Sequence, residues 1–388
     1  MARKRWMLTN QEQDVYVDRF TLRPEHVGGA AAGYSVTKRT LRSGLSQGVD
    51  VVEIHNGRLR LVVVPTRGMS IWRAGCGAVQ LGWSSPVRGP VHPAFVNLWE
   101  PSGIGWLGGF DELLVRCGLE SNGAPEFDST GRLVAPLHGR IANLPAHQVE
   151  LDVDGDSGEI TLTGVVDEAR LFGNKLRMVS TITTTVDQPR FRIVDEISSL
   201  SAEPSELELL YHVNFGPPLL GPGAKVVVPA AKVAPRDAVA AADLDTWDTY
   251  GPQTPGAPEA VFFFDLMADA EGRTRALLRG SAGDQGVSLV FFKNELPCFT
   301  LWKNRQAEAD GYVTGLEPGI NFPNRKSFEK QQGRVAVLRT GQSRRFQIDV
   351  EVHEDAASVA AAEREIAVLA KGVAPRLCPQ GEPSWSPG

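Results

Sequence analysis

Short apolar runs, rich in β-branched residues, recur along most of the chain, and Gly, Pro, Asn or Asp separate them. This pattern is typical of strands joined by turns. The runs do not alternate with long amphipathic helical stretches, so an antiparallel sandwich or barrel is favoured over a parallel βαβ sheet. The clearest runs cover residues 49–54, 58–64, 158–166, 180–186, 190–197, 207–213, 224–229, 260–266, 286–292, 334–340 and 346–352.

Only one segment clearly predicts a helix. It starts at Asp355, repeats apolar residues at a spacing near 3.6, and meets a glycine stop at Gly372. We therefore expect three parts. Residues 1–34 form an N-terminal extension that packs on the domain, 35–355 form one continuous β-domain, and 356–388 form a C-terminal helix with an irregular tail.

The strand rhythm breaks between residues 86 and 145. This region is rich in Gly, Pro and aromatic residues and has few alternating apolar pairs. It predicts a long ordered loop region. Because long loops within compact domains usually carry a site, we expect the region to form one wall of a pocket.

Alternation along residues 205–218 separates an apolar face from a polar one. Leu207, Leu209, Tyr211, Val213 and Phe215 fall on one face, whereas His212 and Asn214 share the other. The strand ends before Gly216, Pro217 and Pro218. His212 is therefore a candidate for chemistry, although a single histidine is more often a structural residue that bonds to a backbone carbonyl.

Alternation along residues 310–319 puts Glu317 on one face with Val313 and Gly315. Gly315 leaves room beside the carboxylate, and Pro318 with Gly319 predicts a sharp turn after it. A carboxylate and an imidazole make a natural acid–base pair, because their reference pKa values of about 4.3 and about 6.5 leave one ionised and the other poised at neutral pH. The sequence does not show that Glu317 and His212 meet.

Three further residues could hold a ligand. His138 and Arg140 lie two apart around a glycine, so an extended segment would present both to one ligand. Arg67 follows a strand-like run and precedes a glycine, which allows close approach. An arginine at a strand end is more often a surface ion-pair partner.

Composition excludes several classes of function. The 388 residues are 42% hydrophobic and 22% charged with a net charge of −6, and no basic stripe with interleaved aromatic residues is present, so nucleic acid is not an expected partner. No apolar run is long enough for a membrane span, and no signal core follows the N-terminus, so we expect a cytoplasmic protein.

Cysteine and motif patterns narrow the choice further. The four cysteines form no CxxC pair and are expected to be reduced and partly buried, and no spacing supports a metal site. The nucleophile elbow, the P-loop, the zinc-protease motif and a convincing dinucleotide-binding glycine motif are all absent.

Three stretches in order, PLHGRIAN, YHVNFGPP and GLEPGINFPN, resemble the aldose 1-epimerase (galactose mutarotase-like) superfamily. With TRGMSIW, CGLESNGAP and LWKN, the set is more similar to a divergent, poorly characterised branch than to the galactose enzymes. The resemblance covers about residues 35–355. It implies a large antiparallel β-supersandwich, in agreement with the strand pattern.

The resemblance also implies roles for particular residues. His212 matches the family's general acid, Glu317 its general base, and His138 a histidine that helps to hold the sugar. Ring opening by the acid–base pair, rotation about the C1–C2 bond and reclosure would interconvert anomers of an aldose without a cofactor. The remaining substrate-binding candidates are Arg67, Arg140, Asn214, Lys303 and Trp302, with Trp106 as a second ring for stacking on a sugar face.

Alternation limits the candidates at 302 and 303. It places Lys303 on the face of Phe299 and Leu301 and sends Trp302 to the opposite face. Trp302 is therefore the better candidate for a pocket wall.

Two other functions remain open. The same pair could abstract a proton beside the carbonyl of a keto-sugar, which would give an epimerase, an isomerase or a lyase, or the domain could be a non-catalytic sugar-binding module. The expected partner is a small-molecule carbohydrate. The residues do not decide the oligomeric state, and a homodimer is one option.

Overall fold

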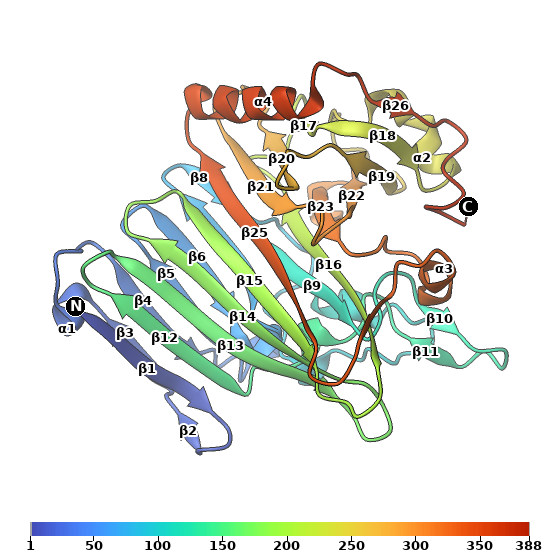
Figure 1. Ribbon diagram of the computed structural model, residues 1–388. Coiled ribbons are helices and arrows are strands. Elements are labelled where there is room, and N and C mark those ends of the chain that lie inside the picture. Colours follow the sequence, from blue (N-terminus) through green and yellow to red (C-terminus); the bar gives the residue numbers. More distant parts are fainter. Residues whose placement is uncertain (1, 388) are drawn as a thin grey trace.

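Two large β-sheets pack face to face in the computed structural model, which describes residues 2–387 (Figure 1). Their buried inner faces form the main hydrophobic core, with residues from both sheets such as Leu162 and Ile182 against Leu61 and Leu209. Every paired strand within them is antiparallel except the short pair β18–β26. The predicted all-β, antiparallel sandwich is therefore confirmed.

The first sheet has ten strands. In spatial order they are β17 (Lys225–Val227), β20 (Arg273–Arg279), β21 (Gly286–Phe292), β25 (Ser343–His353), β15 (Arg190–Ser199), β14 (Lys175–Thr185), β13 (Glu159–Ala169), β12 (Gln148–Asp154), β1 (Arg3–Asn10) and β2 (Val15–Tyr16).

The second sheet has fourteen strands. In order they are β26 (Arg376–Leu377), β18 (Ala230–Pro235), β19 (Ala260–Leu266), β22 (Cys298–Asn304), β23 (Val313–Gly319), β16 (Ser205–Phe215), β9 (Leu114–Leu119), β7 (Ser70–Cys76), β6 (Leu59–Val64), β5 (Asp50–His55), β4 (Ser35–Thr40) and β3 (Arg19–Leu22), with β24 (Ala336–Leu338) on β16 and β8 (Val79–Leu81) on β7.

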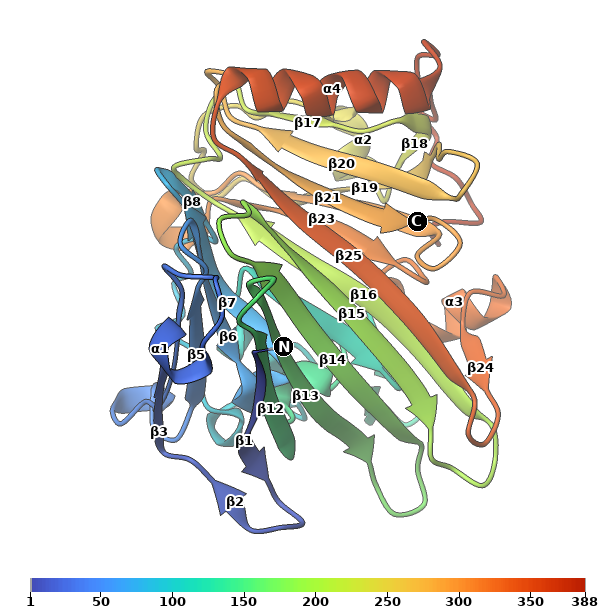
Figure 2. The same ribbon diagram turned by 60° about the vertical axis from the view of Figure 1, so that its left-hand side comes forward.

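The remaining elements are short apart from one helix. They are the hairpin β10–β11 (Glu126–Phe127 and Leu133–Ala135) and the helices α1 (Pro24–Val27), α2 (Ala238–Ala242), α3 (Lys326–Gln331) and α4 (Ala356–Ala370). The α4 helix lies across the end of the first sheet near β17 and β20 (Figure 2). Asp355 caps it by accepting a hydrogen bond from the Ser358 amide, and Gly372 has φ +69°, as the sequence pattern predicts. No helix among residues 2–387 is long and apolar enough to cross a membrane.

The N-terminal segment is more closely joined to the sandwich than an extension that only packs on it. β1 pairs with β12 in the first sheet, and β3 pairs with β4 in the second. Residues 3–22 therefore supply strands to both sheets. At the other end of the chain, β26 joins the second sheet through β18.

The region from 86 to 145 is mostly loops and short turns, as predicted, but it also contains a strand that the sequence did not reveal. Every residue of β9 is buried, so the strand has no alternation to detect. β9 pairs with β16 and fills the middle of the second sheet. The loops on either side of β9 therefore lie against the outer face of β16 and its neighbours.

One buried ion pair joins the two sheets. Arg116 of β9 donates to Asp195 of β15 from Nε at 2.5 Å and from Nη2 at 2.9 Å, and neither side chain is exposed. Asp195 also accepts from the Tyr211 hydroxyl at 2.8 Å, and Ser180 accepts from Arg116 Nη2 at 2.8 Å. The pair is thus surrounded by the hydrogen bonds that a buried charge requires.

Replacing Asp195 by Ala should lower the free energy of unfolding by about 3–5 kcal/mol, because the Arg116 guanidinium would remain buried without its counter-charge. Urea or thermal unfolding measures the change. The control is Asp349→Ala, which breaks the more exposed pair with Arg192 on the same sheet and should cost at most about 1 kcal/mol. Equal losses in the two variants would contradict this account.

Candidate functional site

Strand register places His212 directly opposite Glu317. β16 and β23 pair Leu210 with Gly319 and Val213 with Leu316, so position 212 faces position 317 on the outer side of the second sheet. His212 Nε2 lies 3.2 Å from Glu317 Oε1, and the two residues are 5% and 2% exposed. The contact is not a hydrogen bond, since Oε1 has no hydrogen-bond partner among residues 2–387. The two residues that the sequence singled out therefore lie in contact.

The same register builds the floor around this pair. Thr300 of β22 lies opposite Glu317, which continues the row that starts at His212. In the next row, Gly315 separates Asn214 from Trp302. A Cβ atom on Gly315 would collide with Glu317 Oε1 and lie 3.1 Å from His212 Cε1. The absence of a side chain at 315 is what allows the two groups to meet.

Asn214 sets the tautomer of His212. Its amide nitrogen donates to the carbonyls of Glu112 and His212 at 3.0 and 3.1 Å, so its oxygen faces His212 Nδ1 at 2.6 Å. Nδ1 therefore carries the proton and donates it to Asn214. The lone pair of neutral His212 is left on Nε2, on the side of Glu317.

Burial displaces both pKa values of the pair in the direction of the neutral forms. Loss of solvation lowers the pKa of His212 to about 4, opposed by the hydrogen bond to Asn214. Loss of solvation also raises the pKa of Glu317 well above its usual value, with a further contribution from the charge of Glu259. Both shifts favour a carboxyl group that keeps its proton, next to an imidazole whose Nε2 has none.

A cavity of about 330 Å³ opens above the pair. Three aromatic rings surround the imidazole of His212, with centroids at 5.1 Å for Phe110, 5.3 Å for Trp302 and 6.2 Å for Trp106. The cavity is lined by Ile104, Trp106, Leu107, Phe110, Ala124, Pro125, Leu137, His138, His212, Arg236, Glu259, Val261, Thr300, Trp302, Glu317 and Pro323. The loop region 86–145 thus forms one wall.

His138 is brought to this wall by a left-handed backbone conformation, φ +56°, at the turn before Gly139. Its ring centroid lies 5.5 Å from that of His212, and its Nδ1 lies 3.3 Å from Asn122 Oδ1. Burial, together with the neighbouring His212, lowers the pKa of His138 well below the usual value. His138 is therefore a neutral hydrogen-bonding group on the cavity wall.

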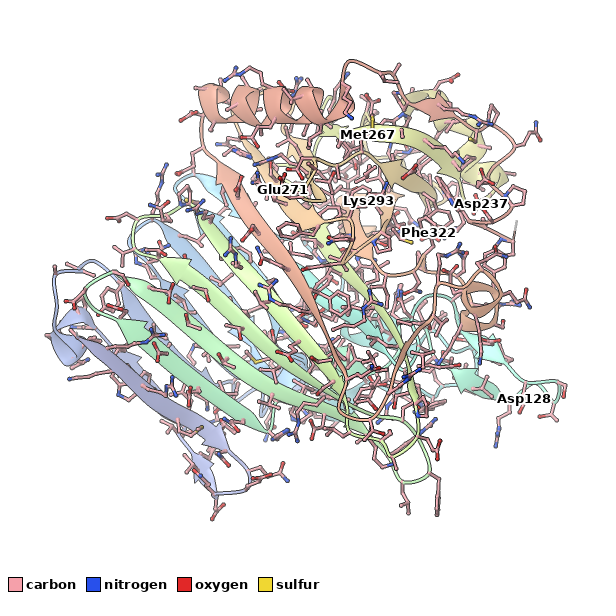
Figure 3. The ribbon with its side chains drawn as sticks, in the orientation of Figure 1. Asp128, Asp237, Met267, Glu271, Lys293 and Phe322 are labelled. Carbon is pink, nitrogen blue, oxygen red and sulfur yellow. The ribbon has the colours of Figure 1, made fainter. Side chains whose placement is uncertain are left out.

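A charged pair marks the mouth. Glu259 accepts from Trp302 Nε1 at 2.7 Å and from Arg236 Nη2 at 3.0 Å, which ties the indole to the rim. Arg236 also donates from Nε to Asp237 at 2.9 Å. Figure 3 shows Asp237 and Phe322 on this side of the molecule, where Phe322 belongs to the apolar cluster that packs against Trp302.

Four of the predicted ligand-binding residues do not line the cavity. Arg67 is fully buried, and its guanidinium nitrogens donate to Glu112, Asn143 and the carbonyls of Val91 and Gly109. Lys303 donates its ammonium protons to the carbonyls of Thr246, Trp247 and Thr249. Neither residue points at the pair, contrary to the sequence-based expectation, because protein acceptors already take these donors.

Arg140 and Asn214 also lie off the cavity wall. Asn214 acts on the site indirectly through His212, as described above. Trp302 and Lys303 do lie on opposite faces of β22, as alternation predicts. His138, Trp302 and Trp106 are the predicted ligand-binding residues that the structure brings to the cavity.

Sequence analysis missed the residues of the rim and one on the floor. Arg236 and Glu259 stand just outside strands, where a charged residue carries no special signal. Thr300 lies in an alternating strand and could have been selected only with the register of β22 on β23 in hand. No group of three or more His, Cys, Asp and Glu side chains within residues 2–387 is arranged to hold a metal ion.

Glu317→Gln should raise the melting temperature at neutral pH. A carboxyl group whose folded pKa is raised destabilises the fold once the unfolded chain ionises, above about pH 4.5. The gain from Gln should therefore be absent at pH 4.5 and grow as pH rises to 7.5, with about 1 °C in melting temperature for each kcal/mol in a chain of this length. Thermal scans across pH measure it, with the exposed Glu203→Gln as the control. A gain that is independent of pH would contradict the assignment.

Gly315→Ala should separate the imidazole from the carboxyl group. The added methyl group cannot fit without moving Glu317, and overpacking of this kind costs about 1–3 kcal/mol of stability. Urea unfolding and a crystal structure of the variant test this. The control, Gly251→Ala, has open space around the added atom and should change neither stability nor the site by a comparable amount. An unmoved pair in the variant would refute the role given to Gly315.

Comparisons with other proteins support the fold and identify the family. The family described as a domain of unknown function, DUF4432, matches residues 46–352. No curated protein matches the chain. A crystal structure from Klebsiella pneumoniae, of a protein provisionally named an aldose 1-epimerase, is 33% identical over 98% of this chain and 100% of its own, with a TM-score of 0.94.

More distant structures share the fold alone. A galactose mutarotase-like protein from Clostridium acetobutylicum is 14% identical over 82% of this chain and 98% of its own, with a TM-score of 0.54. Galactose 1-epimerase from Lactobacillus acidophilus is 12% identical over 82% of this chain and 99% of its own, with a TM-score of 0.52. The chain therefore belongs to the DUF4432 family and has the fold of the aldose 1-epimerase and galactose mutarotase-like proteins.

Proposed function

We propose that the protein is a carbohydrate isomerase that interconverts the α and β anomers of an aldose or a sugar derivative. The observation that carries the proposal is the contact between His212 Nε2 and Glu317 Oε1, at 3.2 Å, on the floor of a cavity large enough for a monosaccharide. The likeness to proteins named as aldose 1-epimerases or galactose mutarotase-like supports it.

Ring opening needs one group that takes a proton and one that gives a proton. In the form that burial favours, the pair carries one proton, on Glu317, and can therefore do both without exchange with solvent. In the roles that the family resemblance implies, the Glu317 carboxyl group first turns into hydrogen-bond geometry with His212 and gives its proton to Nε2. Glu317 then removes the proton of the anomeric hydroxyl while His212 protonates the ring oxygen.

Once the ring has opened, both residues of the pair are back in their starting protonation states. Glu317 again carries the proton, and His212 is neutral. Rotation about the C1–C2 bond exposes the other face of the carbonyl, and reclosure runs the same two transfers backwards. The hydrogen bond from Nδ1 to Asn214 stabilises the imidazolium that forms on the way, because it favours the charged ring.

The cavity walls would position the sugar. Trp106, Phe110 and Trp302 offer aromatic faces to the C–H bonds of a pyranose ring, and His138 offers a hydrogen bond to a hydroxyl. Apolar walls also keep water from the pair, which strengthens the electrostatic interactions within it.

Exchange NMR of α and β signals tests the function on a panel of aldoses. Added protein should accelerate the exchange, and Glu317→Gln and His212→Gln should each lower the rate by about 10²- to 10⁴-fold, because each removes one of the two proton carriers. Glu354 and His55 lie on another part of the surface. The control variants Glu354→Gln and His55→Gln should therefore retain the wild-type rate.

Two results would point elsewhere. Deuterium that enters C2 from heavy water would show enolisation, and therefore keto-sugar chemistry by the same pair. Sugar binding without any acceleration, in the wild type and both variants alike, would identify a binding module and end the proposal.

A further inference from the structure

The cavity offers few partners for hydroxyl groups. Ten of its sixteen lining residues are apolar. Of the six polar ones, His212 and Glu317 form the reacting pair, and Arg236 and Glu259 are bonded to each other at the mouth. His138 and Thr300 remain, together with the indole N–H of Trp106.

Two of these three groups are buried and make no hydrogen bond, and the third has one ring nitrogen free for a ligand. Thr300 Oγ1 and Trp106 Nε1 make no hydrogen bond with any described residue, and Thr300 and Trp106 are each 1% exposed. His138 Nδ1 is near Asn122, which leaves Nε2 for a ligand. The residues best able to bind several hydroxyls at once, Arg67 and Lys303, donate to protein acceptors away from the cavity.

An ordinary aldohexose carries a hydroxyl group on nearly every carbon, and each is both a donor and an acceptor. Hydroxyls that face the mouth reach water and the Arg236–Glu259 pair. Next to the reacting pair, the rings of Trp106, Phe110 and Trp302 surround His212, and Thr300 and His138 are the polar groups among them. A hydroxyl buried against these rings without a partner loses its hydration and gains nothing in return.

Resting on the proposed function, we propose that the substrate is a deoxy sugar. It lacks a hydroxyl near the reacting atoms: either on C2, next to the anomeric carbon, or on C6, which is attached to the carbon that bears the ring oxygen. Hydrogen or a methyl group at that carbon lies against the aromatic rings. Thr300 and His138 bind the hydroxyls that remain.

Matched pairs of sugars test the inference. The pairs are 2-deoxyglucose with glucose, 2-deoxyribose with ribose, and fucose with galactose of the same hand; 3-deoxyglucose with glucose serves as a pair altered at a remote carbon. Binding is measured by calorimetry on the Glu317→Gln variant, so the measured affinity does not depend on turnover. Anomer exchange is measured by NMR on the wild type.

At least one flanking-carbon deoxy sugar should bind tenfold or more tightly than its hydroxylated partner, equivalent to about 1.4 kcal/mol. The 3-deoxy pair should differ by less. Equal or tighter binding of every hydroxylated partner would overturn the inference, while exchange of those partners would leave the proposed function standing. A deoxy preference in binding without any exchange would reject the function alone, and no binding of any sugar would reject both.

Two variants distinguish the effect of cavity-wall polarity on sugar binding from any effect on folding stability. Thr300→Val removes an unpartnered hydroxyl, so it should not lower the melting temperature, yet it should weaken deoxy-sugar binding about tenfold. Val261→Thr adds a hydroxyl to the wall and should narrow the gap between deoxy and hydroxylated partners. Tyr34→Phe also deletes a buried, unpartnered hydroxyl, but outside the cavity, and should leave binding unchanged. Equal effects of Thr300→Val and Tyr34→Phe on binding would count against the inference.

Discussion

The pairing register of β16 on β23 is the constraint on which the site depends. Side chains alternate between the two faces of a strand, so a slip of one residue would carry either His212 or Glu317 into the core between the sheets. The inner face prevents such a slip, because Leu209, Tyr211 and Val213 are buried there with Leu316. Core packing thus fixes the relation between two polar groups on the opposite side of the sheet.

Residues 211 and 212 are neighbours in one strand, yet one supports the buried ion pair between the sheets and the other belongs to the candidate site. The Tyr211 hydroxyl bonds to Asp195 in the ion pair that links the sheets, while His212 points outward to the cavity. A rigid inner network beneath the outer pair supports preorganisation of the imidazole and carboxyl groups. The displaced pKa values of the pair are the electrostatic cost of this arrangement.

Much of the architecture could be predicted because short-range alternation encodes it. Many of the strands, the faces of Leu207–Phe215 and of Trp302 and Lys303, and the cap of α4 follow from local patterns. β9 escaped prediction because it is buried on both faces and shows no alternation. The contact between His212 and Glu317 needed the family resemblance or the structure, since it depends on pairing between strands about a hundred residues apart in sequence.

The hydrogen-bonding side chains were the least predictable part. Arg67 and Lys303 follow the patterns of ligand-binding residues, but their acceptors come from distant segments that the sequence does not place beside them. The rim residues Arg236 and Glu259 have no local signal for the same reason. Long-range partners, rather than residue type, decide whether a charged side chain binds a ligand or supports the fold.

Gly315 provides a way to sort sequences that share this fold. Its backbone does not need a left-handed conformation, so the glycine is required by space alone. A homologue that carries any larger residue there cannot keep an imidazole and a carboxyl group in contact at the neighbouring positions, even if both are retained. Such a homologue would have kept the scaffold while giving up proton transfer between these two groups.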